Sequence, residues 1–287
     1  MSAVDSARNT TAGLSGSALL THLGVIRAQG EDAVKFLQGQ LTQDVALMPA
    51  GDTRLAAFCN AKGRMQASFR VHKRTADELL LVTSADILPA TLKRLSMFVM
   101  RSKLKLSDAT ADFSLYGLLG NASVSGAASG GQTRAEGQND AENLLLPLPA
   151  ADGTPRTLCL APAGAPAPAG PALTEADWLW AEVRSGVARI TQPVVEAFVP
   201  QMLNYESVGG VSFKKGCYPG QEVVARSQFR GAIKRRAYVG HVAGAAQAGQ
   251  EVFSAADPDQ PVGQIAQAAA ADDAAAVIAV LQVAEVA

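Results

Sequence analysis

The sequence predicts an α+β fold, and two features of its apolar pattern carry that prediction. Over the first 119 residues, short apolar stretches typical of strands alternate with longer stretches whose apolar residues recur at helical spacing. Such alternation favours a sheet with helices packed on one face. After residue 237 only short strand-like stretches follow, separated by Gly and Asp-Pro turns, which is typical of a small β-barrel.

The N-terminal elements follow from local signals. A strand is expected over 19–28, and a helix starts at 30–32, where Asp32 in the first turn suits the helix dipole. Strands over 55–59 and 65–71 form a hairpin, because Asn60 and Gly63 between them are turn residues. The following elements are a strand over 78–83, a helix over 87–100, and strands over 104–106 and 113–119.

The middle of the chain contains two flexible connections, 120–142 and 161–171, which are rich in small residues and lack periodicity. Between them we expect strands over 143–147 and 156–160. Thr174 then opens a helix, since Asp177 three residues later completes a capping box, and Gly186 ends it. Trp178 on this helix has two interpretations, core packing or an aromatic wall for a flat ligand.

The length of 287 residues predicts more than one domain. We expect a flexible arm over 1–18, an N-terminal α+β domain over 19–119, a middle α+β domain over 120–230, and the short C-terminal β-barrel over 231–287. The barrel strands are expected over 238–242, 251–253, 262–267 and 275–280. So short a tail should pack on the middle domain rather than stand alone.

Composition excludes several classes of protein. A net charge of -1 argues against a surface that binds nucleic acid throughout. Three widely spaced cysteines suggest no disulfide framework, and three scattered histidines suggest no zinc site. The first 18 residues lack the pattern of a signal peptide, and no apolar stretch is long enough to span a membrane, so we expect a cytoplasmic protein without membrane contact.

The densest chemistry lies around Cys217. A cysteine reacts as its thiolate, which nearby positive charge and a helix N-terminus favour. Lys214 and Lys215 precede Cys217, Pro219-Gly220 fits the centre of a type II turn, and a short helix is expected from Gln221 to Arg226. Two interpretations stay open, a reactive thiol at the mouth of a turn or a small buried hydrophobe.

A basic run follows this motif and also has two interpretations. Its cations are either a solvated surface or a docking site for carboxylates and phosphates. The residues are Arg226, Arg230, Lys234, Arg235 and Arg236.

Five blocks resemble the YgfZ family, the folate-binding relatives of the glycine-cleavage T-protein. The most specific is Lys-Gly-Cys-Tyr-x-Gly-Gln-Glu at 215–222, and the others lie at 36–45, 59–64, 198–201 and 209–213. The resemblance implies a T-protein-like fold with three domains in a ring around a central folate-binding hole. It also implies tetrahydrofolate or a derivative as cofactor, and a role in assembling or repairing iron-sulfur clusters in client enzymes, among them enzymes that thiolate tRNA.

The same resemblance assigns roles to residues. Cys217 is the motif cysteine of the family. We expect it to act as a nucleophile or as a transient iron-sulfur ligand, with Lys215 favouring its thiolate. Trp178 stands where the family places a tryptophan facing the folate, and Leu23 replaces a second aromatic residue. The expected cofactor-binding residues are Trp178, Gly216, Tyr218, Gly220, Gln221, Glu222 and Arg226.

Three hypotheses for the function follow. The first is a folate-binding accessory protein whose partners are folate and iron-sulfur client or carrier proteins, with an indirect link to tRNA modification. The second is a folate-dependent aminomethyltransferase, but Gln66 and Ala67 stand where T-proteins carry an acidic pair, and neither residue serves as a general base. The third is a module that contacts tRNA through the basic run, with steeply salt-dependent binding.

Overall fold

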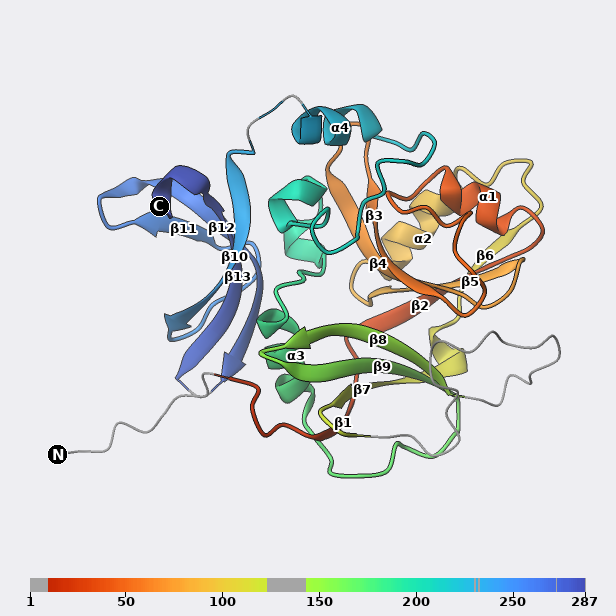
Figure 1. The fold of residues 1–287 in the computed structure, drawn as a ribbon, viewed down its shortest axis with the longest axis horizontal. Coiled ribbons are helices and arrows are strands. Elements are labelled where there is room, and N and C mark those ends of the chain that lie inside the picture. The colour runs from red at the N-terminus through yellow and green to blue at the C-terminus, as the bar shows by residue number, and fades with distance from the viewer. Residues whose placement is uncertain (1–9, 123–142, 230, 232, 272, 287) are drawn as a thin grey trace.

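The computed structural model describes residues 10–122, 143–229, 231, 233–271 and 273–286. Within these ranges the chain forms three antiparallel sheets with helices beside and between them, which confirms the α+β prediction (Figure 1). The first half of the arm, residues 1–9, and most of the connection predicted over 120–142 lie outside the described residues.

The first sheet has the strand order β3-β4-β5-β2-β6. Its strands are β2 (Leu23–Gln29), β3 (Thr53–Cys59), β4 (Met65–Lys73), β5 (Glu78–Ser84) and β6 (Lys105–Asp108), and helices α1 (Ala33–Gln38) and α2 (Leu88–Ser96) accompany it. The predicted hairpin is present, since β3 and β4 pair antiparallel from Thr53 opposite His72 to Cys59 opposite Met65. Both helices bury apolar side chains, among them Phe36 and Leu37 of α1 and Leu88 and Leu95 of α2.

The pairing of the second sheet shows that the prediction of one strand over 19–28 is wrong. This stretch is divided between two sheets, because β1 (Gly16–Leu19) pairs with β7 (Phe113–Leu119), whereas β2 pairs with β5 and β6. The remaining strands are β8 (Leu144–Ala151) and β9 (Thr154–Pro162), and the order is β1-β7-β9-β8. Strand β1 therefore begins inside the segment assigned to the arm.

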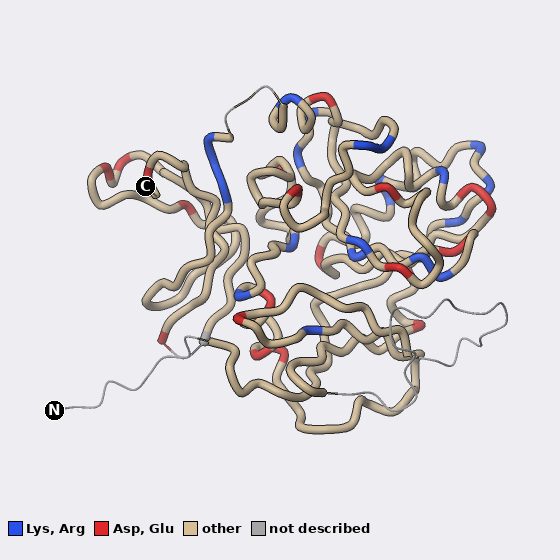
Figure 2. Tube along the Cα trace, in the orientation of Figure 1, with Lys and Arg blue, Asp and Glu red and all other residues tan. Residues whose placement is uncertain are grey.

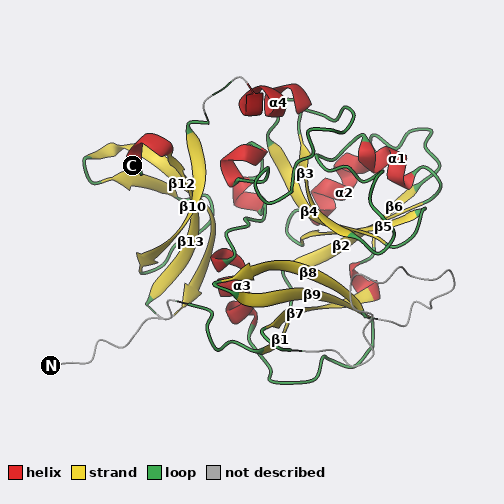
Figure 3. Ribbon diagram, in the orientation of Figure 1, coloured by secondary structure: helices red, strands yellow, loops and turns green. Residues whose placement is uncertain are grey.

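Helix α3 (Glu175–Arg184) lies between the sheets, as the red helix near the centre of Figure 3 shows. Its predicted capping box is present: the Thr174 hydroxyl accepts from Asp177 N at 3.1 Å, and the Asp177 carboxylate accepts from Thr174 N at 2.9 Å. The helix packs Trp178 into the cluster that the first and second sheets share, and Trp180 into the large cluster that the first sheet shares with the C-terminal strands. It therefore holds Trp178 in a fixed position.

The C-terminal strands do not close into the predicted barrel. They are β10 (Arg235–Ala243), β11 (Glu251–Ser254), β12 (Asp257–Ala271) and β13 (Ala274–Gln282), and they form an open sheet in the order β10-β13-β12-β11. The long β12–β13 hairpin forms the middle of this sheet, and β10 and β11 are its two edges, which do not pair with each other. Short 3-10 turns lie at Thr110–Asp112, Gln192–Val194, Pro200–Leu203 and Val283–Glu285. Among the described residues, no helix is long and apolar enough to cross a membrane.

Candidate functional site

The cysteine motif forms a tight turn that leads into helix α4 (Gln221–Phe229). Gln221 N donates to Tyr218 O at 3.2 Å, and Gly220 has a φ of +79°, as the third position of a type II turn requires. Cys217 precedes this turn and is exposed, whereas Cys59 and Cys159 are buried. Of the two interpretations of Cys217, the structure supports an accessible thiol rather than a core residue.

The turn is fixed against the β3–β4 hairpin. A Cβ atom on Gly220 would lie 2.4 Å from Asn60 O and 2.6 Å from the backbone of Gly63, so only glycine fits there. Gly63 itself has a φ of +71° and faces Val223 of α4. The block at 59–64 therefore supports the block at 215–222.

The variant Gly220→Ala is expected to lose about 2 kcal/mol or more of unfolding free energy, because it combines a left-handed backbone angle with a backbone clash. Urea denaturation of the purified protein measures this loss. Gly216→Ala is the matched control in the same motif, since a Cβ there meets no atom within 4 Å. Equal stability of the two variants would contradict the close packing of Gly220.

The block at 36–45 holds the segment 209–212, which leads into the cysteine motif. Thr42 donates its hydroxyl to Gly210 O at 2.6 Å and accepts at its backbone carbonyl from Ser212 N at 2.9 Å. The Gln43 amide donates to Gly209 O at 2.5 Å. Blocks that are far apart in the sequence thus meet around one loop, which presents Cys217 on a fixed backbone.

Lys215 is buried, unlike its exposed neighbour Lys214. Its Nζ donates to Leu41 O at 2.5 Å and to Gln38 O, and it lies 4.8 Å from the centre of the Tyr218 ring. Burial lowers the pKa of Lys215 to about 8, although the negative charges of Asp44 and of a Cys217 thiolate act in the opposite direction. Lys215 therefore ties the loop to the end of α1.

This burial predicts a pH dependence. Below pH 8 Lys215 is charged in both the folded and unfolded protein, so folding bears the full cost of burying the ammonium group. Between pH 8 and its ordinary pKa of 10.5 the folded state releases the proton while the unfolded state keeps it. The stability of the wild type relative to Lys215→Met should therefore rise across this window.

Denaturation of both proteins across the window measures that difference, and Lys214→Met serves as the exposed control. If the unfolding free energies of the wild type and of Lys215→Met changed in parallel with pH, the burial of the Lys215 ammonium group would be contradicted.

The remaining predicted residues of the motif differ in their exposure to solvent. Gly216 is exposed, Tyr218 is buried beneath the loop, and Gln221 is partly buried at the start of α4. Glu222 and Arg226 form an exposed ion pair at 2.9 Å along α4. In the basic run, Arg236 is bound by Gln201 O, Asn204 and Glu206, so it is not free to bind a phosphate. Arg230 lies outside the described residues.

Trp178 lines a separate cavity between the first two sheets and α3. The cavity has a volume of about 50 Å³ for the centres of water-sized molecules, so it is narrow. Its lining includes Leu23, Arg70, Arg156, Trp178, Glu182, Arg189 and Tyr205. Among the described residues of the cysteine motif, none lines it.

Two arginines bring positive charge to this cavity, Arg70 from β4 of the first sheet and Arg156 from β9 of the second. The Arg156 guanidinium lies 4.5 Å from the centre of the Trp178 ring and is only 3% exposed. Burial lowers its pKa to about 10, and the Glu182 charge partly offsets this effect. Arg156 Nε and Trp178 Nε1 are both buried without a hydrogen-bond partner among the described residues. Burial also lowers the pKa of Arg70.

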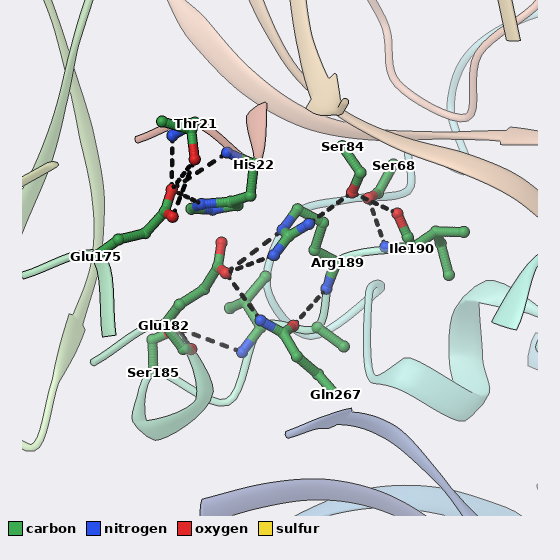
Figure 4. A network of polar contacts seen from close by, with 12 residues as sticks. Thr21, His22, Ser68, Ser84, Glu175, Glu182, Ser185, Arg189, Ile190 and Gln267 are labelled. Carbon is green, nitrogen blue, oxygen red and sulfur yellow. Dashed lines mark hydrogen bonds and ion pairs between the residues drawn. The ribbon is translucent and has the colours of Figure 1, made fainter. Parts of the chain in front are cut away.

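Glu182 supplies the one carboxylate among the described lining residues. Burial acts to raise its pKa, but the charges of Arg189, His22 and Arg156 lower it to about 2. Its Oε2 accepts from Arg189 at 3.2 Å and from Gln267 of the C-terminal sheet at 2.8 Å, and Arg189 also donates to Ser84 (Figure 4). Nearby, His22 and Thr21 bind Glu175, which ties the start of β2 to α3.

The structure thus separates the residues that the sequence grouped together. The cysteine motif forms one site at the surface. Trp178 belongs to the cavity, together with Leu23, which the family resemblance pointed to, and with arginines that no motif contained. Arg156 could have been found by its place in β9, where it alternates onto the same buried face as Leu158 and Leu160. Gln66, in place of the T-protein acidic pair, donates to Glu196 at 2.8 Å.

Known proteins resemble this chain in both sequence and fold. Residues 10–128 match the GCVT N-terminal domain. The aminomethyltransferase T of the glycine cleavage system from Bartonella henselae has the same fold, with a TM-score of 0.65 and 14% identity over 94% of this chain and 79% of that one. An uncharacterized protein of Haemophilus influenzae is 33% identical over 77% of this chain and 71% of its own length.

Two further relatives carry a shared name. The tRNA-modifying protein YgfZ of Cronobacter sakazakii is 32% identical over 78% of this chain and 70% of its own length, and that of Serratia proteamaculans is 32% identical over 75% and 67%. These matches extend well beyond the cysteine motif and agree with the T-protein-like fold. The chain therefore belongs to the YgfZ family.

Proposed function

We propose that this protein binds tetrahydrofolate or a derivative and serves the assembly or repair of iron-sulfur clusters in client enzymes, including enzymes that thiolate tRNA. Membership of the YgfZ family supports the proposal, since relatives carry the name tRNA-modifying protein. The match to the GCVT N-terminal domain supports a folate ligand. Cys217 and the Trp178 cavity have separate tasks in this proposal.

The observation that carries the folate assignment is the pair of buried donors beside the cavity. Arg156 Nε and Trp178 Nε1 have no partner among the described residues, and a buried donor without a partner costs about 1 to 3 kcal/mol. A ligand with acceptor atoms would satisfy both. A pterin is one such ligand, since its flat ring offers a carbonyl oxygen and ring nitrogens as acceptors.

The charges of the cavity also fit such a ligand. Arg70, Arg156 and Arg189 line it against the single carboxylate of Glu182, and Oε2 of that carboxylate already accepts from Arg189 and Gln267. The surplus of cations favours acceptor-rich or anionic groups. Tetrahydrofolate, when bound, would supply a carrier for one-carbon units, while the residues of this chain would bind and orient it.

Cys217 supplies the second task. Its exposed thiol is accessible to a macromolecular substrate, and the buried ammonium group of Lys215 holds the loop that carries it. A cluster is typically held by four protein ligands. Among the described residues no group of three or more His, Cys, Asp and Glu could hold a metal ion. We infer that any cluster is a substrate held by the client, which Cys217 attacks or ligates transiently.

Complementation tests this function. In a bacterial strain that lacks its own YgfZ protein, the chain should restore the level of thiolated tRNA and the activity of the iron-sulfur enzyme that makes it. Both are measured, because a change in tRNA alone could have another cause. If the complemented strain contains no more thiolated tRNA than the deletion strain, the proposal is overturned.

A further inference from the structure

The chain carries a surface groove that belongs neither to the cavity nor to the cysteine motif. It lies between α1 and the loop that follows α2, residues 97–104, hereafter the 97–104 loop. The groove has a volume of about 480 Å³ and is lined by Asp32, Lys35, Phe36, Gly39 and Gln40 on one side and by 98–102 on the other. The Asp32 carboxylate already accepts from Lys103 N, so the side chains of Lys35 and Arg101 are the charges left for a partner.

The 97–104 loop exposes three large apolar side chains. Met97 is 63% exposed, Phe98 42% and Met100 88%. The loop backbone is held at both ends, since Phe98 N donates to Leu95 O at 3.0 Å and Lys103 N donates to the Asp32 carboxylate at 2.7 Å. Three exposed apolar residues on a fixed loop beside a groove are typical of an interaction site.

Positive charge surrounds these apolar residues. The exposed cations Lys35, Lys93, Arg94, Arg101 and Lys105 form no ion pair with any other described residue, whereas Lys103 pairs with Glu31. Figure 2 shows several of the blue segments at the end of the molecule that carries α1 and β6. In a chain with a net charge of -1, this is a local departure that favours an acidic partner.

We propose that the groove and the 97–104 loop form a docking surface for a partner protein that presents an acidic segment with an apolar anchor residue. The anchor would enter the groove beside Phe98 and Met100, and the acidic side chains would meet Lys35 and Arg101. Methionine adapts to differently shaped partners, and Met, Phe and Arg are enriched at protein interfaces.

The same residues fit RNA less well. Single-stranded RNA binds through bases that stack on free aromatic faces. Phe98 is the only aromatic side chain exposed in the 97–104 loop, and the Arg94 guanidinium already lies 5.5 Å from the centre of its ring. A protein segment is therefore the occupant that the surface favours.

The groove lies beside the segment that holds Lys215 and the Cys217 loop. Gly39 and Gln40 line it, and the flanking carbonyls of Gln38 and Leu41 accept from Lys215. A partner in the groove would thus contact the segment that anchors the Cys217 loop. The docking surface stands independently of the proposed function, since none of its residues touches the cavity or the thiol.

Site-specific photocrosslinking tests the proposal in the full-length protein. A benzophenone amino acid at position 100 should crosslink in cells to protein segments that hold more Asp and Glu than Lys and Arg. The yield should fall about tenfold when Lys35→Glu and Arg101→Glu are combined. The same probe at Phe253, exposed on the C-terminal sheet, is the control site.

Three outcomes would overturn the docking surface: crosslinks mainly to RNA, crosslinks unaffected by the charge reversals, or a yield no higher than at position 253. Thermal melting of each variant confirms its folding. If the double reversal fails to fold, the neutral pair Lys35→Gln and Arg101→Gln replaces it and should still lower the yield severalfold.

Discussion

The variant Arg156→Met is expected to bind tetrahydrofolate about 10- to 100-fold more weakly than the wild type. Arg156 is buried beside the cavity, its Nε has no partner among the described residues, and its guanidinium covers the Trp178 ring. Its pKa of about 10 keeps it charged at neutral pH. Methionine removes the donors and the charge while filling similar space. Isothermal titration calorimetry measures the affinity.

Two further variants make this result specific. Arg156→Lys keeps a charge but not the flat guanidinium, so it should recover only part of the affinity. Arg54→Met removes an arginine that pairs with Asp52 outside the cavity, and it should bind as the wild type does. Methionine at 156 should lower stability, because it removes one of the charges that hold down the pKa of buried Glu182, so thermal melting is used to confirm that the variant is folded. Wild-type affinity in Arg156→Met would exclude Arg156 from the binding site.

The variant Cys217→Ala is expected to reduce thiolated tRNA in the complemented strain to the level of the strain without the gene. The thiol is exposed at the end of a fixed loop, so its loss removes the reacting atom without disturbing the core. Folate affinity and the thermal melting temperature should stay at wild-type values, because Cys217 does not line the cavity. This combination separates the chemical task of Cys217 from a structural one.

The other cysteines provide the control. Burial raises the pKa of Cys59 to about 12 and that of Cys159 to about 11, so neither thiol is reactive at neutral pH. Cys159→Ala should therefore keep full function in cells, apart from a modest loss of stability from the small space it leaves. Full complementation by Cys217→Ala would refute the role of the thiol.

Local signals in the sequence were sufficient where a few neighbouring residues determine the structure. The capping box of Thr174 and Asp177 fixes the start of α3, and Pro219-Gly220 fixes the turn before α4. In both cases the hydrogen-bonding groups lie within a few residues of each other. The hairpin of β3 and β4 was found for the same reason.

Long-range pairing was not predictable in this way. Apolar alternation over 19–28 cannot reveal that the chain passes from one sheet to another near Thr21. Closure of the C-terminal sheet depends on the number of paired strands, which spacing along the chain does not give. The helix predicted over 87–100 ends at Ser96, and Phe98, whose helical spacing predicted a place on the buried face, is exposed.

In the candidate sites, too, local features were predictable and long-range contacts were not. The residues around Cys217 follow from one continuous motif, although the burial of Lys215 depends on carbonyls of a distant segment. The Trp178 cavity combines residues from β2, β4, α3 and β9 and from the segment after α3, so no single motif contains it. Its arginines were missed because a charged residue in a strand is more often at the surface. The domain boundaries proposed from composition stay a prediction.

Titration with tetrahydrofolate, followed by intrinsic tryptophan fluorescence, tests the folate site most directly. Trp178 and Trp180 are the two tryptophans of the chain, so Trp178→Phe leaves Trp180 as a reference. Calorimetry in parallel distinguishes lost binding from a lost reporter. Saturable quenching in the wild type that is largely absent in Trp178→Phe would place the folate against Trp178. Absence of saturable quenching and of binding heat in the wild type would contradict a folate-binding cavity.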